Sequence, residues 1–475
     1  MSWNRRELLA GLGVGSASLL VAFGCGAPVQ QVKRQVAVRS DVRAWLRDAV
    51  SRLATVYPQV HALAVSRRRT TAAIDILGTG VARVRRDGVV FTVRDKNGIH
   101  RELVTAELSE AGVQAAVRAL APGKPRPGNV RFPLPPAPAP EPKALAELGL
   151  KNRVGAIQRL DRSDSSRIVY AAAAIDIDDV TVWSIAPGID LEQQRRRVKK
   201  HVVRAAWNGT RPSVSTVERG WTGEVDDQQL SEEEVTGASL NAMLVMTPGA
   251  FADGDAQVVL EPGVTAMIVD AAVSGLLTSA AARRPEVARR LALGATVAGP
   301  NLTLVDDPRA AAAYGGFTFD DEGATAELVT LLDGGRVAGR LDKGRMRRAG
   351  HVGLLAPVPS HLRLSPGTGT RSDLYGDGWL LEGKVSAAFD PASDRIVVAC
   401  ARARELKAGA LTGHVFADVE LVGDLATMLA KVDGIAAESA TAVLLDDIGG
   451  EPLWRSIEAP WLRTRGIVRA RRRQT

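Results

Sequence analysis

The stretch that decides the fold is Phe317-Thr318-Phe319-Asp320-Asp321-Glu322-Gly323, in which aromatic and polar residues alternate before three carboxylates and a glycine. An acidic turn before glycine is the commonest use of such a cluster, and calcium binding by the same carboxylates is the alternative. Glycine-rich turn signals surround it at Gly315-Gly316, Asp333-Gly334-Gly335 and Tyr375-Gly376-Asp377-Gly378. Turns at this density predict a β-rich unit with many short strands.

We expect this β-rich unit to span residues 252–473 and to contain an embedded helix. The Ala-rich segment from Asp270 to Leu293 predicts that helix. The apolar residues that follow Glu261-Pro262-Gly263 predict a strand in front of it. Together with the two units upstream, described next, this pattern predicts the α+β fold class.

The first upstream unit, residues 40–121, has the pattern of an α/β unit. Asp41 is a candidate N-cap, and the apolar residues after it recur at helical spacing. They are Val42, Trp45, Leu46, Ala49, Val50 and Leu53. Strand-like runs at 89–93 and 99–105 flank Lys96-Asn97-Gly98, and Asn-Gly tolerates the positive φ angles of a hairpin turn. A second helix is predicted from Ser109 to Leu120.

A proline-rich segment, residues 122–142, separates this unit from the next. It contains nine prolines and can neither pair in a sheet nor continue a helix. We interpret it as an interdomain linker, with a ligand for a proline-binding partner as the alternative.

The central unit, residues 143–248, has the pattern of an antiparallel meander. Two strands, Ile168–Ile177 and Val180–Ile185, are predicted to be joined by a turn at Asp178-Asp179. Two more, Val198–Trp207 and Ser213–Arg219, are predicted to be joined at residues 208–210. Ser231 and Glu234 have the spacing of a capping box that opens a helix.

The N-terminal residues 1–25 have the pattern of an export signal. Arg5 and Arg6 directly precede an uncharged stretch from Leu8 to Phe23, which is too short for a typical membrane-spanning helix. The arginine pair predicts a twin-arginine signal, and a generic positive segment is the alternative. Cys25 follows Ala22-Phe23-Gly24 and is a candidate lipidation site, with ordinary cleavage nearby as the alternative. We therefore expect the protein to be exported to the periplasmic face of a bacterial membrane and anchored there by lipid. If Cys25 is not acylated, we expect a soluble periplasmic protein.

The net charge of +8 does not indicate nucleic-acid binding, because charges of both signs alternate along most of the chain. Six arginines and no acid lie between Leu462 and Thr475. We expect a solvated terminal segment there, and contact with anionic lipid or an acidic partner is the alternative. Of the two cysteines, Cys400 lies in an apolar strand-like run and is predicted to be a buried, inert thiol.

The motifs of the C-terminal unit, in their order and spacing, resemble those of the TldD/PmbA metallopeptidase family, and the two upstream units are similar to that family's upstream domains. The motifs are Glu261-Pro262-Gly263, Val305-Asp306-Asp307, the stretch at 317–323, residues 331–339, and Ser365-Pro366-Gly367-Thr368-Gly369. The resemblance implies an α+β protein with an N-terminal α/β unit, a central antiparallel meander and a β-rich C-terminal domain with an embedded helix. Active members trim unfolded peptides, typically as a pair of related subunits of which one carries the metal.

The resemblance also implies a zinc motif, His-Glu-x-x-x-His, and a cysteine near the C-terminus. In this chain the motif falls at Val269, Asp270 and Ser274, and the region around residues 448–450 has no thiol. Catalytic zinc needs about three nitrogen, sulfur or carboxylate ligands, and neither valine nor serine provides one. The sequence therefore predicts no catalytic residue and no metal ligand here. We expect Asp270 to be a helix-start carboxylate.

The remaining histidines do not rebuild a standard zinc motif. None of His61, His100, His201, His351, His361 and His414 has a partner at zincin spacing. A substitute site that combines His351 and His361 with Asp320 or Asp321 is conceivable.

Three hypotheses for function follow from the sequence. The first is a non-catalytic pseudoenzyme without a cofactor, which binds extended peptides or pairs with a metal-bearing TldD-like subunit or with a second copy of itself. The second is an active metallopeptidase that cleaves unfolded peptides through an unorthodox zinc site. The third is an envelope lipoprotein that serves as a scaffold for other proteins.

Overall fold

The computed structural model describes residues 39–120, 146–163, 165–207, 212–248, 251–348, 355–448 and 451–471. Several sequence predictions lie outside these residues. They are the signal with Arg5, Arg6 and Cys25, the linker at 122–142, the turn at 208–210, His351, and Gly449-Gly450. Among the described segments, no helix combines the length and the apolar composition needed to cross a bilayer.

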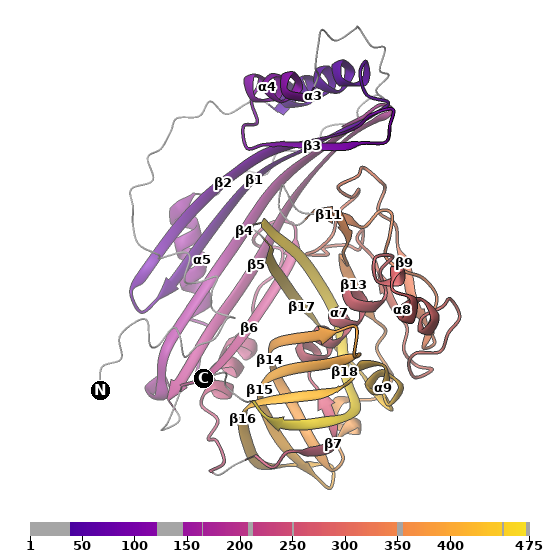
Figure 1. Ribbon diagram of the computed structural model, residues 1–475. Coiled ribbons are helices and arrows are strands. Elements are labelled where there is room, and N and C mark those ends of the chain that lie inside the picture. The colour runs from indigo at the N-terminus through magenta and orange to yellow at the C-terminus, as the bar shows by residue number, and fades with distance from the viewer. Residues whose placement is uncertain are drawn as a thin grey trace.

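Within the described residues the chain forms a long six-stranded antiparallel sheet in the order β3-β2-β1-β4-β5-β6 (Figure 1). Its strands are β1 (Gln59–Asp75), β2 (Gly78–Arg94), β3 (His100–Thr105), β4 (Ile168–Ala186), β5 (Ile189–Trp207) and β6 (Pro212–Thr222). Because β1 pairs with β4, the strands on both sides of the predicted linker belong to one sheet. The predicted hairpin at Lys96-Asn97-Gly98 is confirmed, since β2 pairs with β3 and Gly98 has a φ of +82°.

Four helices cover parts of this sheet in the described residues. They are α3 (Arg39–Ala54), α4 (Glu110–Leu120), α5 (Glu147–Gln158) and α6 (Glu232–Ala242). Helices α3 and α4 lie at one end of the sheet (Figure 1), and the predicted apolar face of α3 is buried there. Helix α3 begins before Asp41, which therefore lies in the first turn and is not the N-cap. The predicted capping box of α6 is confirmed, because Ser231 and Glu234 exchange both hydrogen bonds.

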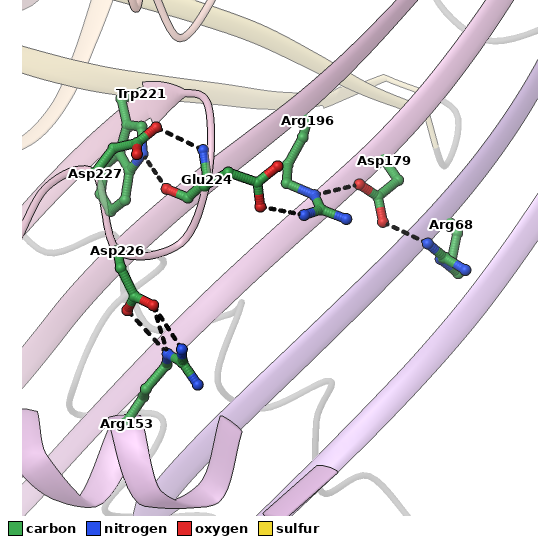
Figure 2. A network of polar contacts seen from close by, with 8 residues as sticks. All are labelled: Arg68, Arg153, Asp179, Arg196, Trp221, Glu224, Asp226 and Asp227. Carbon is green, nitrogen blue, oxygen red and sulfur yellow. Dashed lines mark hydrogen bonds and ion pairs between the residues drawn. The ribbon is translucent and has the colours of Figure 1, made fainter. Parts of the chain in front are cut away.

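The predicted turn at Asp178-Asp179 is wrong, because β4 continues through both residues and turns only at Pro187-Gly188. Figure 2 shows that Asp179 lies between Arg68 of β1 and Arg196 of β5. Arg68 Nη2 donates to Asp179 Oδ2 at 2.9 Å, and Arg196 Nε donates to Asp179 Oδ1 at 2.7 Å. Paired aspartates usually mark a turn, but here the neighbouring strands neutralise the carboxylates and allow a strand to pass through.

A second, ten-stranded sheet is formed by the C-terminal unit, which we define as residues 251–471. Strands β18, β16, β15, β14 and β7 pair in a closed ring, since β7 contacts both β14 and β18. The described strands of the sheet are β7 (Gly254–Leu260), β8 (Leu304–Asp306), β9 (Val329–Asp333), β10 (Arg336–Val337), β13 (His361–Leu364), β14 (Gly378–Asp390), β15 (Arg395–Lys407), β16 (Ala410–Asp424), β17 (Gly434–Ile448) and β18 (Glu451–Ala470). A short pair, β11 (Met346–Arg348) and β12 (Leu355–Pro357), lies apart from it. The α+β fold class is confirmed.

The embedded helix of this unit starts earlier than predicted. Helix α7 runs from Pro262 to Leu276, and a 3₁₀ turn (Ala281–Arg283) and α8 (Pro285–Arg290) follow it. The apolar run after Glu261 is therefore helical, although it was expected to be a strand. A short apolar run fits a buried helix as well as a strand, and Pro262 stands at the first helical position, where proline is favoured.

The basic C-terminal segment is not a solvated end over its described part. It forms the last part of β18, and its arginines pair with acids on neighbouring elements. The pairs are Arg463 with Asp433, Arg465 with Asp255, and Arg469 with Glu420, at 2.7, 2.8 and 2.8 Å. The expectation of a fraying end is therefore wrong up to residue 471.

The C-terminal unit packs on one face of the long sheet, and the stretch at 317–323 lies in this contact. On β5, Arg195 donates to the Gly316 carbonyl at 2.6 Å and Gln193 donates to the Phe319 carbonyl at 3.0 Å. The Phe317 ring lies 5.9 Å from the guanidinium of Arg195 and 4.9 Å from that of Arg347. Burial and nearby arginines lower the pKa of Arg195. The fold-deciding stretch thus connects the two sheets.

Candidate functional site: a motif helix closed by an arginine

The candidate site is centred on α7, which follows β7 after a single residue, Glu261. Most of the helix is buried against the strands of the C-terminal ring. The three motif positions have different surroundings. The Val269 side chain is buried, that of Asp270 is 15% exposed, and Ser274 is exposed.

The spacing of the motif separates its two outer positions. Five residues of a regular α-helix turn through about 140° beyond one full turn, so Val269 and Ser274 project in different directions. Val269 lies on the face that packs into the core, next to Ile268 and Ala272.

A cation occupies the face that carries Asp270 and Ser274. Arg455, on β18, places its Nη1 atom 2.9 Å from Asp270 Oδ1 and 3.4 Å from Ser274 Oγ. Its side chain is 8% exposed. A guanidinium is permanently charged and has no lone pair for a metal, so it excludes a second cation from this position. The residues present do not fit a zinc ion.

The expected role of Asp270 as a helix-start carboxylate is wrong. The helix begins at Pro262, so Asp270 lies in its middle, well beyond the first turn where the helix dipole favours an acid. Its position is explained by Arg455, which sequence reasoning missed. Arg455 is 185 positions away from Asp270 in the chain, and no local pattern relates the two residues.

A second polar group lies at the start of α7. Glu261 accepts a hydrogen bond from the Gly383 amide, and Arg402 pairs with Glu382 at 2.9 Å. Burial, together with the charge of Glu382, raises the pKa of Glu261 to about 7. Sequence reasoning used Glu261 only as part of a motif and did not predict this carboxyl as a titrating group.

Comparison with known proteins places this site in a family. Residues 253–470 match the profile of the PmbA/TldA metallopeptidase C-terminal domain. Over 204 residues the chain is 24% identical to Metalloprotease MJ0996 of Methanocaldococcus jannaschii, a match that covers 40% of this chain and 45% of that protein. This chain belongs to the TldD/PmbA family. The part of this chain that aligns in sequence spans less than half the length of that relative.

Solved structures share the fold of this TldD/PmbA protein. TldE from Thermococcus kodakarensis has a TM-score of 0.70, with 90% of this chain and 100% of that chain covered. A protein from Bacteroides thetaiotaomicron, proposed in its name to modulate DNA gyrase, has a TM-score of 0.69, with coverages of 91% and 99%. Each is 14% identical to this chain, so these likenesses show the fold alone.

Cys400 lies on β15, is 1% exposed and has no disulfide partner among the described residues, so the predicted buried thiol is confirmed. Burial and the nearby Glu261 raise its pKa, which keeps the thiol protonated. In the described part of the chain, no group of three or more His, Cys, Asp or Glu side chains has the arrangement of a metal site.

The acidic stretch at Asp320-Asp321 is confirmed as a turn. The Asp320 carboxylate accepts hydrogen bonds from the backbone amides of Glu322, Ala324 and Met346 at 2.9–3.0 Å. Gly323 has a φ of +80°. These bonds occupy both carboxylate oxygens of Asp320, one of the three acids that the calcium alternative would use. His361, the described member of the proposed substitute site, bonds instead to Ser456 Oγ at 2.8 Å through its Nδ1 atom.

Proposed function

We propose that this chain is a non-catalytic TldD/PmbA-family subunit, which binds extended peptides or pairs with a metal-bearing relative. The observation that carries the proposal is the ion pair between Arg455 and Asp270. It places a fixed positive charge on the motif helix, where active members would need zinc ligands. A metallopeptidase mechanism needs a metal to activate water, so loss of the ligands removes the chemistry and leaves the scaffold.

Peptide binding does not require the lost ligands. An extended peptide can add to the edge of a sheet through backbone hydrogen bonds alone. The long sheet ends at β3 and β6, and β3 consists of half-buried and exposed residues. These features support an edge that accepts a further strand.

Metal analysis tests the loss of catalysis. The full-length protein, purified from its host without chelators, is expected to contain transition metal only well below one atom per chain. Unfolded casein should not be cleaved in a chelator-sensitive manner. An Arg455→Gln variant, which removes the blocking charge but adds no ligand, should be equally metal-free. One tightly held metal atom per chain with chelator-sensitive cleavage would establish the alternative, an active peptidase with an unorthodox site.

The proposed partner is tested separately. Native purification followed by size-exclusion chromatography with mass measurement should recover a complex with a related subunit, with a second copy of the chain or with peptide. A bare monomer that shows no affinity for unfolded peptides would contradict the binding function.

We also propose that the protein is exported and lipid-anchored, on the basis of Arg5, Arg6 and Cys25. Changing both arginines to lysine keeps the positive charge, so retention of this variant in the cytoplasm would distinguish a twin-arginine signal from a generic one. Cys25→Ala should release the protein from membranes. Unchanged fractionation of both variants would overturn this assignment.

A further inference from the structure

A cavity of about 360 Å³ lies under α7, on the face opposite to the Asp270–Arg455 pair. Helix α7 supplies one wall, with Thr265, Val269, Ala272 and Leu276. Loop and strand residues such as Leu302 and Leu462 supply the others. The volume falls in the range of roughly 300–1,000 Å³ that is typical of pockets for small molecules.

The side chains that line the cavity are mainly aliphatic. Leucine, isoleucine, valine, alanine and methionine side chains form most of it, four threonines contribute as well, and no aromatic ring from the described residues lines it. Such a surface favours a saturated or lightly unsaturated hydrocarbon, because burial of apolar area is the main attraction that it offers. It offers little to a sugar, a nucleotide or an extended peptide backbone, which need many hydrogen-bonding partners.

The residues that line the cavity extend along α7. Thr265 and Leu276 both line the cavity and are eleven residues apart on α7, so the cavity follows the helix for about 16 Å at 1.5 Å per residue. This length suits one extended alkyl chain.

One cation, Arg290, lies among the described residues that line the cavity. Arg290, at the end of α8, lines the cavity and its side chain is 38% exposed. It contacts Asp394 at 2.6 Å through a single nitrogen, Nη2. A guanidinium has five N–H donors, so Arg290 can hold Asp394 and still offer donors to a second carboxylate.

We propose that this cavity binds one free long-chain fatty acid, with its alkyl chain along α7 and its carboxylate at Arg290. This inference goes beyond the proposed peptide-binding function, since it concerns another face of α7 and another ligand. A fatty acid in this position contacts Val269 and Ala272, so it would also fix the position of the motif helix.

A fluorescent fatty acid tests the cavity. Titration of the full chain with cis-parinaric acid should give saturable binding at one site. Ala272→Phe fills the middle of the cavity and should weaken binding at least tenfold. If Ala272→Phe does not fold, as judged by circular dichroism, the smaller change Ala272→Leu takes its place.

The head group is tested with a matched pair of variants. Arg290→Gln should weaken cis-parinaric acid about tenfold, which is the loss expected for one charged hydrogen bond, and should leave its methyl ester unaffected. Arg289→Gln changes the neighbouring exposed arginine and should alter neither affinity. Solvent extraction of freshly purified protein should release a long-chain carboxylic acid in near-equimolar amount.

Four outcomes would overturn the proposal. The first is that cis-parinaric acid shows no saturable binding to the wild type, and the second is that a folded cavity-filling variant binds it unchanged. The third is that Arg290→Gln weakens the acid and its methyl ester equally. The fourth is that solvent extraction releases phospholipid in place of a free fatty acid.

Discussion

The ion pair between Arg455 and Asp270 gives the sharpest prediction about this molecule. Arg455→Met keeps most of the side-chain volume but leaves the Asp270 carboxylate, 15% exposed, without the charge of Arg455. Removing one partner of a fully buried ion pair costs about 3–5 kcal/mol, whereas an exposed ion pair contributes only about 0.2–1 kcal/mol. Because Asp270 keeps some contact with solvent, we expect a loss of about 2 kcal/mol in the free energy of unfolding.

Thermal unfolding measures this loss. For a unit of this size a change of 1 kcal/mol moves the melting temperature by about 2–4 °C, so Arg455→Met should lower it by about 4–8 °C. Arg465→Met is the matched control on the same strand, since Arg465 and Asp255 are each 53% exposed. An exposed pair contributes little, and the control should shift the free energy of unfolding by less than about 1 kcal/mol.

A double variant measures the interaction between the two charges separately from the other contacts of each residue. Replacing both Arg455 and Asp270 with apolar residues removes both charges and should recover most of the stability, because no buried charge is left alone. The reasoning would be refuted by an Arg455→Met variant that melts with the wild type, or by single losses that simply add in the double variant.

Three further predictions concern other buried groups. Thr265→Val should raise the free energy of unfolding by about 1 kcal/mol in a urea titration, because the buried hydroxyl of Thr265 has no hydrogen-bond partner among the described residues. Glu261 has a pKa raised from 4.5 to about 7, so its stabilisation is complete below pH 4.5 and is lost as the pH rises through 7. Glu261→Gln should therefore flatten the fall in melting temperature over that interval; an unchanged profile would contradict the assignment. Asp179→Asn should destabilise the long sheet by about 1–2 kcal/mol in the same urea assay, since Arg68 and Arg196 each lose one charged acceptor.

Local features were predicted well because their causes lie within a few residues. The buried face of α3, the hairpin at Lys96-Asn97-Gly98 and the capping box at Ser231 follow from helical spacing, a permissive turn residue and a reciprocal hydrogen bond. The acidic turn at Asp320 belongs to the same class, as its main partners are backbone amides close in the chain.

Features that depend on distant partners were missed. Asp178-Asp179 has the composition of a turn, but arginines of two neighbouring strands hold it inside β4. The basic C-terminal segment has the composition of a solvated end, but acids such as Asp433 and Glu420 hold it in β18. In both cases the decisive charge is supplied across a sheet, and sequence periodicity carries no information about it.

The candidate site also combines features that the sequence determines with features that depend on distant partners. The sequence by itself determined that Val269 and Ser274 are poor zinc ligands, because the donor atoms of a side chain are fixed by its chemistry. Only the tertiary structure decided what stands in that place, since pairing with β17 and β13 positions this part of β18, and β18 sets Arg455 against Asp270. Coulomb attraction between two groups acts through space and falls with their separation, so it depends on the folded chain and not on the order of residues.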